Sequence, residues 1–329
     1  MDLRFYDYEF HLKKIVPSYI SANWTLYYND VGTAEFHFSP TDSAVETILE
    51  NDYLVVTQGD LQAIVTGKRV AQDDVAVYGR TMNWILTRRV IPKFKTTQLL
   101  EEGIITRCDA VQITQYVVNT AFSDVELITC EDSPPAFDEM EPFWRNVTNA
   151  ASDVIRECLE ENGGGHRVVY DLEKQIWRYE ILLGQSKNLI LSESLKNAYE
   201  TQYDEDCQDY YSAGWYEVEN EGEEGGEPET EWIRLEKDTD KEGIYLWEGK
   251  LSGSCESEAK ADLKKKKWMR EGSAGALSMR YGVDYQLGDS ATIQLSVGDR
   301  RISTTERIIG VQIWNDEEGS GERPIFEEE

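Results

Sequence analysis

Three acidic residues and a glycine occur at the spacing of the first half of a calcium-binding loop. They are Asp238, Asp240, Glu242 and Gly243. Alternate carboxylates followed by a glycine turn can surround Ca²⁺, but such a loop ends with a bidentate Glu at its twelfth position, and that position is Gly249 here. A hairpin turn that joins residues 233–235 to residues 245–247 explains the same acids more simply. Calcium is therefore the second hypothesis for this stretch.

The sequence contains none of the common catalytic or nucleotide-binding motifs. GxGxxG, GxxxxGK, HExxH and GxSxG are all absent. The three histidines, His11, His37 and His166, lie in aromatic strand-like stretches or after a glycine turn, which favours structural roles. We therefore predict no catalytic, cofactor-binding or metal-ligating residue beyond the calcium hypothesis.

The cysteines are odd in number and widely separated. They are Cys108, Cys130, Cys158, Cys207 and Cys255. Such spacing is not typical of a disulfide framework or of a paired-cysteine metal site. We interpret them as reduced, mostly buried thiols of a protein made in a reducing cytoplasm.

The chain is strongly acidic and yet rich in apolar residues. Its 329 residues include 33 Lys and Arg against 63 Asp and Glu, a net charge of -30, while 40% are hydrophobic and 9 are Trp. That much apolar surface indicates a folded protein. The charge argues against binding to nucleic-acid phosphates or to an anionic membrane, because both need Lys and Arg. No apolar run approaches the ~18 residues of a membrane span and no secretion signal is recognised, so no stable membrane insertion is expected.

The charge is distributed unevenly along the chain. Residues 1–95 carry 10 bases and 12 acids, whereas residues 96–165 carry 3 bases and 14 acids. Residues 217–231 contain eight acids and no base, and residues 316–329 contain seven acids and one base. Such shifts in composition mark candidate boundaries. Together with the expected elements they give three predicted segments, namely residues 1–95, 96–185 and 186–329.

The first segment is predicted to form a small barrel or a strongly bent sheet. The expected strands are residues 3–10, 24–28, 34–38, 53–57 and 61–66. Residues 58–60 give a hairpin turn signal. One helix is expected after Thr41, Asp42 or Ser43, any of which can cap it, and Ser43 with Glu46 has the spacing of a capping box.

The second segment is predicted to be a helix-plus-hairpin module. Apolar residues recur every three or four positions in residues 110–121 and 143–159, which predicts two amphipathic helices. The glycines at 163–165 are expected to end the second helix. Strands at residues 167–170 and 176–182 then form a hairpin.

The third segment is predicted to form a second barrel-like domain. The expected strands are residues 209–218, 232–236, 244–247, 291–297 and 301–309, with a helix at 256–270. The acidic loop 217–231 is expected to be solvated, and residues 316–329 form an acidic C-terminal tail. Four lysines at 264–267 are interpreted as a solvated helix face near a helix C-terminus, because a nucleic-acid site needs a wider basic surface.

Several stretches resemble the tail-hub family of long-tailed bacteriophages, whose members sit at the tail tip or baseplate. In the N-terminal part the resemblance rests on residues 79–91, a glycine and small-apolar segment followed by Leu and an Arg-Arg-apolar pattern. In the C-terminal part it rests on residues 188–193, on Asp209-Tyr210-Tyr211, and most specifically on residues 281–289. These last residues contain an Asp-Tyr-x-Leu-Gly-Asp element that precedes a strand. The acidic loop and tail depart from the family pattern.

The end of this element also has a local physical explanation. Gly288 can take the positive φ of a tight turn, Asp289 can bond back to the turn backbone, and Leu287 can anchor the turn on the core. A similar β-turn occurs in many barrels, so the order and spacing of all the stretches carry the resemblance.

The resemblance implies a mainly β, α+β protein with a phage baseplate-hub-like fold, in which two barrel-like tube domains carry inserted smaller α/β modules. It implies a structural virion protein that assembles as a homotrimer. The trimeric ring would join the distal tail protein ring to the tail tip and line the DNA exit channel. Other implied partners are tail-tip or fibre proteins and the tape measure protein. The implied location is the phage tail, assembled in the cytoplasm of the bacterial host.

Two other functions remain open from the sequence. A tail-associated cell-wall hydrolase is one, although the chain leaves no room for an appended domain and lacks catalytic constellations. A carbohydrate-binding receptor protein is the other, suggested by the number of Trp residues, most of which lie in strand patterns typical of cores. We expect a protein that is not an enzyme.

Overall fold

The computed structural model describes residues 1–129, 134–145, 150–220, 229–237, 242–253, 255–277, 279–317 and 319–327. As predicted, the described chain is mainly β, with helices between the strands. It forms two compact units. The first contains Met1–Tyr199, Gly275–Thr292 and Thr305–Glu327, and the second contains Glu200–Ala274 and Ile293–Thr304.

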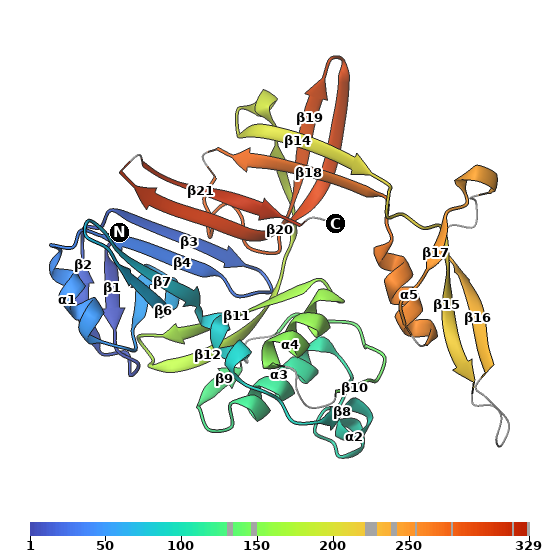
Figure 1. Cartoon of the computed structure of the whole chain (residues 1–329), viewed down its shortest axis with the longest axis horizontal. Helices are drawn as coiled ribbons and strands as arrows, with labels where there is room; N and C mark the ends of the chain where they lie inside the picture. The colour runs from blue at the N-terminus through green and yellow to red at the C-terminus, as the bar shows by residue number, and fades with distance from the viewer. Residues whose placement is uncertain are drawn as a thin grey trace. The chain divides into compact units, whose positions relative to one another are not determined.

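One sheet of eleven strands runs through the chain from its N-terminal to its C-terminal strands (Figure 1). In spatial order its strands are β13 (Ser186–Leu191), β19 (Ser290–Val297), β20 (Arg300–Asp316), β3 (Ser21–Tyr27), β4 (Thr33–Phe38), β7 (Val75–Thr81), β6 (Leu61–Val70), β5 (Val55–Gln58), β1 (Leu3–Tyr6) and β2 (Leu12–Val16), with β21 (Gly319–Phe326) also paired to β20. Strands of the first and third predicted segments meet where β3 pairs with β20, with Leu26 opposite Val311. Among the described residues the pairing is an open path, so no barrel is closed by hydrogen bonds. That residues 1–95, 96–185 and 186–329 form separate domains stays a prediction.

The N-terminal strands enclose a dense apolar core. Side chains alternate between core and surface along β4, which places Phe36 and Phe38 inside. The indole of Trp24 packs edge-on against Phe36 and donates a hydrogen bond to Oε1 of Gln58 at 2.7 Å. Helix α1 (Ser43–Glu50) covers part of this core, and Asp42 is its N-cap because its carboxylate accepts from the backbone N of Ala44.

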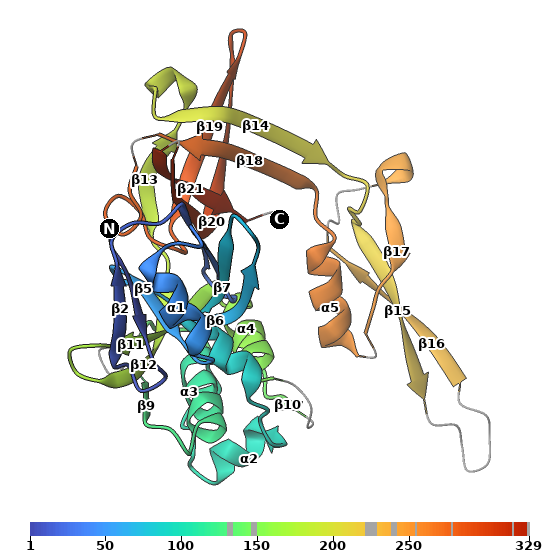
Figure 2. The same cartoon turned by 60° about the vertical axis from the view of Figure 1, so that its left-hand side comes forward.

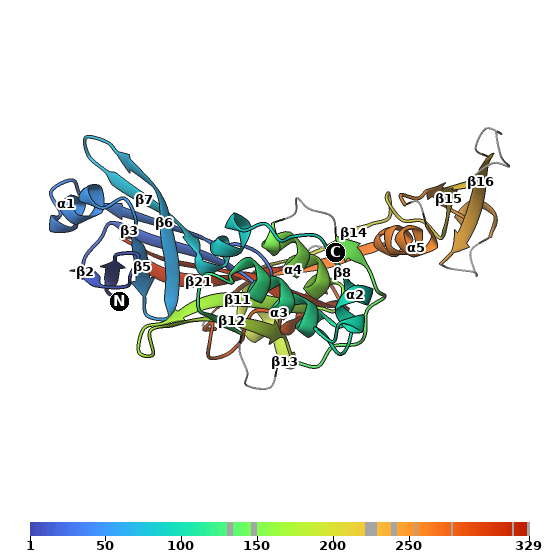
Figure 3. The same ribbon diagram turned by 90° about the horizontal axis from the view of Figure 1, so that it is seen from below.

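The predicted helix-plus-hairpin module contains short strands and helices packed on the hairpin (Figure 3). Its elements are α2 (Thr96–Glu101), α3 (Ala110–Ala121), β9 (Leu127–Thr129), β10 (Trp144–Arg145), α4 (Ala151–Glu160), β11 (Gly164–Asp171) and β12 (Ile176–Leu183). Strand β10 pairs with β8 (Phe94–Lys95), which lies at the end of the first predicted segment. Helix α3 has the predicted bounds and is capped by Asp109, which accepts from the backbone N of Gln112. Buried apolar residues of α3, α4, β11 and β12 form one core cluster. The 3-10 helix η1 (Met82–Arg88) adds Met82 and Leu86 to this cluster, so the core extends into the first predicted segment.

The second predicted helix begins later than expected. Helix α4 starts at Ala151 instead of residue 143, so that part of the prediction is wrong. The reason is strand pairing. The backbone of Phe143 exchanges hydrogen bonds with Thr96, and Trp144 pairs with Lys95.

The second unit contains a ribbon, a three-stranded sheet and a helix (Figure 2). The ribbon pairs β14 (Ala198–Asp206) with β18 (Met269–Ala276). The first residues of β14 and the last residues of β18 belong to the first unit. The sheet has the order β16 (Glu229–Glu236), β15 (Ala213–Asn220), β17 (Glu248–Lys250). Helix α5 (Glu256–Lys265) packs on β15 and β16.

Several predictions in this region are wrong. The helix predicted at 256–270 ends at Lys265, because the backbone turns at Lys266 and β18 starts at Met269. Residues 244–247 do not form a strand, since Gly243–Tyr245 is a 3-10 helix. Strand β17 pairs with β15 in parallel, on the side opposite β16, so the predicted hairpin between residues 233–235 and 245–247 does not form.

Both acidic segments contain strands. Strands β15 and β16 extend into the predicted loop 217–231 up to the Asn220–Glu229 pair, and residues 221–228 lie outside the described residues. The predicted tail contains β21, which pairs with β20 from Ile308 to Asp316. Gly321 allows this pairing, since a Cβ there would lie 2.3 Å from the ring of Trp314. The acidic tail is therefore largely an edge strand of the sheet.

Candidate functional surfaces

The turn that carries the most specific part of the resemblance, residues 285–289, is buried. Gly288 has a φ of +89°, a conformation that favours glycine. The side chain of Leu287 is buried, and the carboxylate of Asp289 accepts a hydrogen bond from the backbone N of Gln286 at 2.8 Å. The predicted roles of these three residues in the turn are confirmed.

Asp289 also fastens the turn to two other strands. Its carboxylate accepts from the backbone N of Gln185 at 2.9 Å and lies 2.7 Å from Nζ of Lys187, at the start of β13. Its backbone O accepts from the backbone N of Ile308 in β20. A buried carboxylate needs such donors, and that of Asp289 has the backbone N of Gln286, the backbone N of Gln185 and Nζ of Lys187. The turn is therefore a structural junction of the sheet.

Tyr28, which follows β3, completes this junction. Its hydroxyl accepts from the backbone N of Gly184 at 3.0 Å and lies 3.1 Å from the carbonyl O of Leu182. Its ring lies against Gly165 and Gly288, where an added Cβ would come within 2.4 Å of Tyr28. Burial raises the pKa of Tyr28, so the phenol stays protonated and can donate. Segments far apart in the sequence are thus locked together around one side chain.

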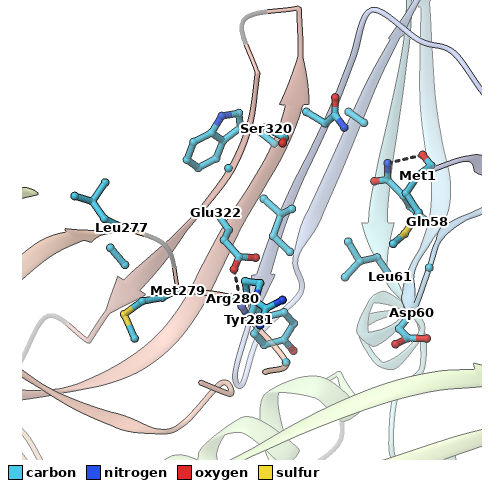
Figure 4. A pocket seen from close by; sticks show the side chains of 18 of the residues that line it. Met1, Gln58, Asp60, Leu61, Leu277, Met279, Arg280, Tyr281, Ser320 and Glu322 are labelled. Carbon is cyan, nitrogen blue, oxygen red and sulfur yellow. Dashed lines mark hydrogen bonds between the residues drawn. The ribbon is translucent and has the colours of Figure 1, made fainter. Parts of the chain in front are cut away.

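A cavity of about 950 Å³ lies in the first unit (Figure 4). One wall comes from Met1 and the turn between β5 and β6, including Asp60 and Leu61. The opposite wall comes from β21, including Glu322, and from the segment that contains Arg280. Most of its lining is apolar, and a few polar groups converge on it, which is the usual composition of a binding site.

The carboxylate of Glu322 is the main polar group of this cavity. It accepts a hydrogen bond from the backbone N of Tyr281 at 2.6 Å (Figure 4). Burial raises the pKa of Glu322, and the nearby carboxylate of Asp284 adds to that effect, whereas Arg280 opposes it. Arg280 itself lies 3.8 Å from Asp284. A cationic group entering the cavity would therefore be stabilised by Glu322.

Three strands at the borders of the sheet have one open side. Among the described residues, β2 pairs only with β1, β13 only with β19, and β21 only with β20. Leu12 and Ile15 of β2 are 50% and 46% exposed. Open edges with exposed apolar side chains are sites at which another chain can add a strand.

The second unit carries an aromatic cluster with cations around it. The rings of Trp247 and Trp268 stack with centroids 6.1 Å apart, and Tyr210 meets both rings. Nζ of Lys237 lies 5.1 Å from the centre of the Tyr210 ring, and Arg270 lies over Trp268. Since Trp268 is 41% exposed, these contacts lie partly at the surface.

The histidines have structural contacts. His37 lies between carboxylates, with Nδ1 2.9 Å from Asp74 and Nε2 2.9 Å from Glu35. Buried His166 places Nδ1 2.7 Å from Oδ1 of Asn29. His11 is exposed and contacts nearby acids.

The predicted calcium residues are only partly covered by the structure. Asp238 and Asp240 lie outside the described residues, and Glu242 is exposed just before the 3-10 helix at Gly243. In the part of the chain that the structure describes, no three His, Cys, Asp or Glu side chains are grouped as a metal site. Calcium binding stays a hypothesis.

Sequence reasoning missed the cavity. It identified the turn at residues 58–60 and the stretch 281–289, but nothing in the sequence indicates that Asp60 and Glu322 would lie on facing walls. Such a placement depends on the twist and bending of the sheet.

None of the described helices is both long and apolar enough to cross a membrane.

The fold of the chain is that of phage tail proteins. A tail protein from Neisseria meningitidis MC58 is 10% identical, with a TM-score of 0.58 over 100% of this chain and 96% of that one. The 43 kDa tail protein of prophage MuSo2 from Shewanella oneidensis is 11% identical, with a TM-score of 0.61 over 100% and 98%. Prophage tail protein gp18 from Listeria monocytogenes EGD-e is 12% identical, with a TM-score of 0.54 over 99% and 94%.

The N-terminal part of the sequence also matches a phage protein family. Residues 2–106 match the family model of the Siphovirus ReqiPepy6 Gp37-like protein. No curated protein is similar enough in sequence to match the chain. The predicted resemblance to phage tail proteins is confirmed by the family match and by the fold of the whole chain.

Proposed function

We propose that this protein is a structural hub subunit of a phage tail tip or baseplate, and that three copies form a ring. The observation that carries the proposal is the eleven-stranded sheet, whose border strands β2, β13 and β21 each have one open side among the described residues. A head-to-tail contact between unlike edges closes into a ring when the rotation per subunit is a third of a turn. The fold shared with tail proteins over nearly their full length supports the same assignment.

The ring joins the distal tail protein ring to the tail tip and lines the channel through which DNA leaves. With a net charge of -30, an acidic wall repels the phosphate backbone, so DNA passes without being retained. The remaining proposed partners are tail-tip or fibre proteins and the tape measure protein. The subunit assembles in the host cytoplasm and ends in the virion tail.

The oligomeric state tests this proposal directly. Native mass spectrometry and light scattering of the purified full chain should give three times the mass of one subunit at micromolar concentration. A monomer at every concentration would contradict the ring. Cryo-electron microscopy of the particle should then place three copies around the tail axis, and a position away from that axis would contradict the channel.

The proposed role is structural and includes no enzymatic activity. Its buried carboxylates and histidines are held by structural hydrogen bonds, as the contacts of Asp289 and His166 illustrate. Zymography on peptidoglycan should therefore give no clearing, and clearing by the purified chain would favour the hydrolase instead.

A further inference from the structure

We propose that the cavity of the first unit receives strand β2 of the neighbouring copy, so that Lys13 and Lys14 reach the carboxylates of Asp60 and Glu322. This inference rests on the proposed ring and identifies the two surfaces that meet in it. The contact is heterologous, because β2 and the cavity are different surfaces of the same subunit.

The cavity favours a basic side chain flanked by apolar ones. Glu322 lies in a cavity with a mostly apolar lining and, although Arg280 is on the same wall, forms no ion pair among the described residues. Asp60 also forms none, and it lies on the facing wall (Figure 4). Leu61 and Ile313 contribute apolar lining to the same cavity. A partly desolvated carboxylate gains from a nearby cation, because its attraction is screened less than at an open surface.

Strand β2 carries the matching groups, and among the described residues it pairs only with β1, while α1 contacts part of it. Neither Lys13 nor Lys14 forms an ion pair within the described residues, although acids outnumber bases about two to one in the chain. Leu12 and Ile15 are each about half exposed beside them. Unpaired cations and exposed apolar side chains on one edge strand indicate an edge that a partner covers.

The geometry of a strand explains how both lysines are used. Successive side chains point to opposite faces, so Lys13 and Lys14 project in opposite directions. A strand that enters between facing walls therefore directs one lysine to each wall. The open side of β21, which includes Glu322, offers backbone groups for the same strand.

Charge reversal and repair test the pairing in the full chain. The K13E/K14E variant should weaken trimer formation at least about tenfold in sedimentation velocity, because like charges then face each other. D60K/E322K should weaken it similarly, and combining all four substitutions should restore most of the affinity. K93E reverses another exposed lysine that forms no ion pair within the described residues, and it should leave the trimer unchanged. E322Q, which keeps an acceptor for Tyr281, should weaken association without changing the far-ultraviolet circular dichroism of the subunit.

A cysteine pair gives an independent measurement. In a C255S background, which removes the one exposed thiol among the described cysteines, K14C with S320C should form intermolecular disulfides that yield covalent dimers and trimers. A wild-type protein that is a monomer contradicts the proposed ring itself. A wild-type trimer that persists in K13E/K14E, or that the fourfold variant fails to restore, overturns only the β2–cavity contact.

Discussion

The N-terminal part of the large sheet and the second unit are stabilised in different ways. The N-terminal strands and α1 share a core of seventeen buried apolar residues. In the described part of the second unit, one cluster contains four buried apolar residues, Tyr216, Leu251, Ala259 and Leu263. This unit adds contacts between cations and partly exposed rings, such as Lys250 over Trp232 and Lys266 over Tyr211. The described core cluster is therefore much larger in the first region than in the second unit.

This difference suits the proposed contact, in which edge strand β2 of the N-terminal region binds a neighbouring copy. A region with a dense core keeps its shape while an edge strand binds a partner, because packing holds each side chain in one arrangement. The family model matches residues 2–106, which include this region. The second unit contains the acidic strands β15 and β16, whose side chains can change with little effect on packing elsewhere. We therefore expect mutations to act globally in the first region and locally in the second.

The largest effect is expected for Phe36→Ala. Phe36 is fully buried and packs against Trp24, so its removal leaves a cavity and should lower the free energy of unfolding by about 3–5 kcal/mol. Urea denaturation of the full chain measures this change. Tyr8→Ala, at a side chain that is 70% exposed, should cost less than about 0.5 kcal/mol. Similar losses in both variants would contradict the dense core.

A smaller and local effect is expected for Leu263→Ala in α5. Leu263 is buried in the cluster of four, so the loss should be about 2–3 kcal/mol for the second unit. Hydrogen exchange should accelerate in β15, β16 and α5 and stay unchanged in β3 and β4. The matched control is Lys264→Ala on the same helix, which is exposed and should change neither. Faster exchange in β3 and β4 would show that the two regions unfold together.

Acid should destabilise the first unit through His166. Burial, with a smaller contribution from Arg156, lowers the pKa of His166 to about 3, whereas an unfolded His titrates near 6.5. Between these values the unfolded chain binds a proton that the folded chain does not, so stability falls by about 1.4 kcal/mol per pH unit, or about 2 kcal/mol at pH 5. His166→Gln keeps a group that can bond Asn29 and should flatten this slope. Parallel slopes for the two proteins would refute the assignment.

Local patterns predicted local structure well. Periodicity gave α3 with its observed bounds, and the turn chemistry of Gly288 and Asp289 predicted both the positive φ and the hydrogen bond to Gln286. These features depend on residues close together in sequence. The resemblance to phage tail proteins likewise rested on short stretches and on their order along the sequence, and the fold agrees with it.

Local sequence patterns did not predict the pairing of strands that lie far apart in the sequence. Phe143 continues the helical period of α4, yet Thr96, far away in sequence, fixes it in strand pairing. The acidic tail was not recognised as β21, because Gly, Ser and Pro weaken its strand pattern and only the pairing with β20 stabilises it. The cavity follows from such pairings, so no sequence signal could have placed Asp60 opposite Glu322.

The smallest effect distinguishes His37 from His166 by its sign. Burial opposes protonation of His37, but hydrogen bonds with Asp74 and Glu35 outweigh it, so its pKa is raised. This stabilisation is fully present below the unfolded pKa of about 6.5 and is lost as pH rises through the folded pKa. Because the site is partly exposed, less than about 1 kcal/mol is at stake. Thermal unfolding between pH 6 and 8 should therefore show wild type losing slightly more stability than His37→Gln, opposite in direction to the acid effect of His166. A larger loss in His37→Gln would mean that the two carboxylates do not favour the protonated ring.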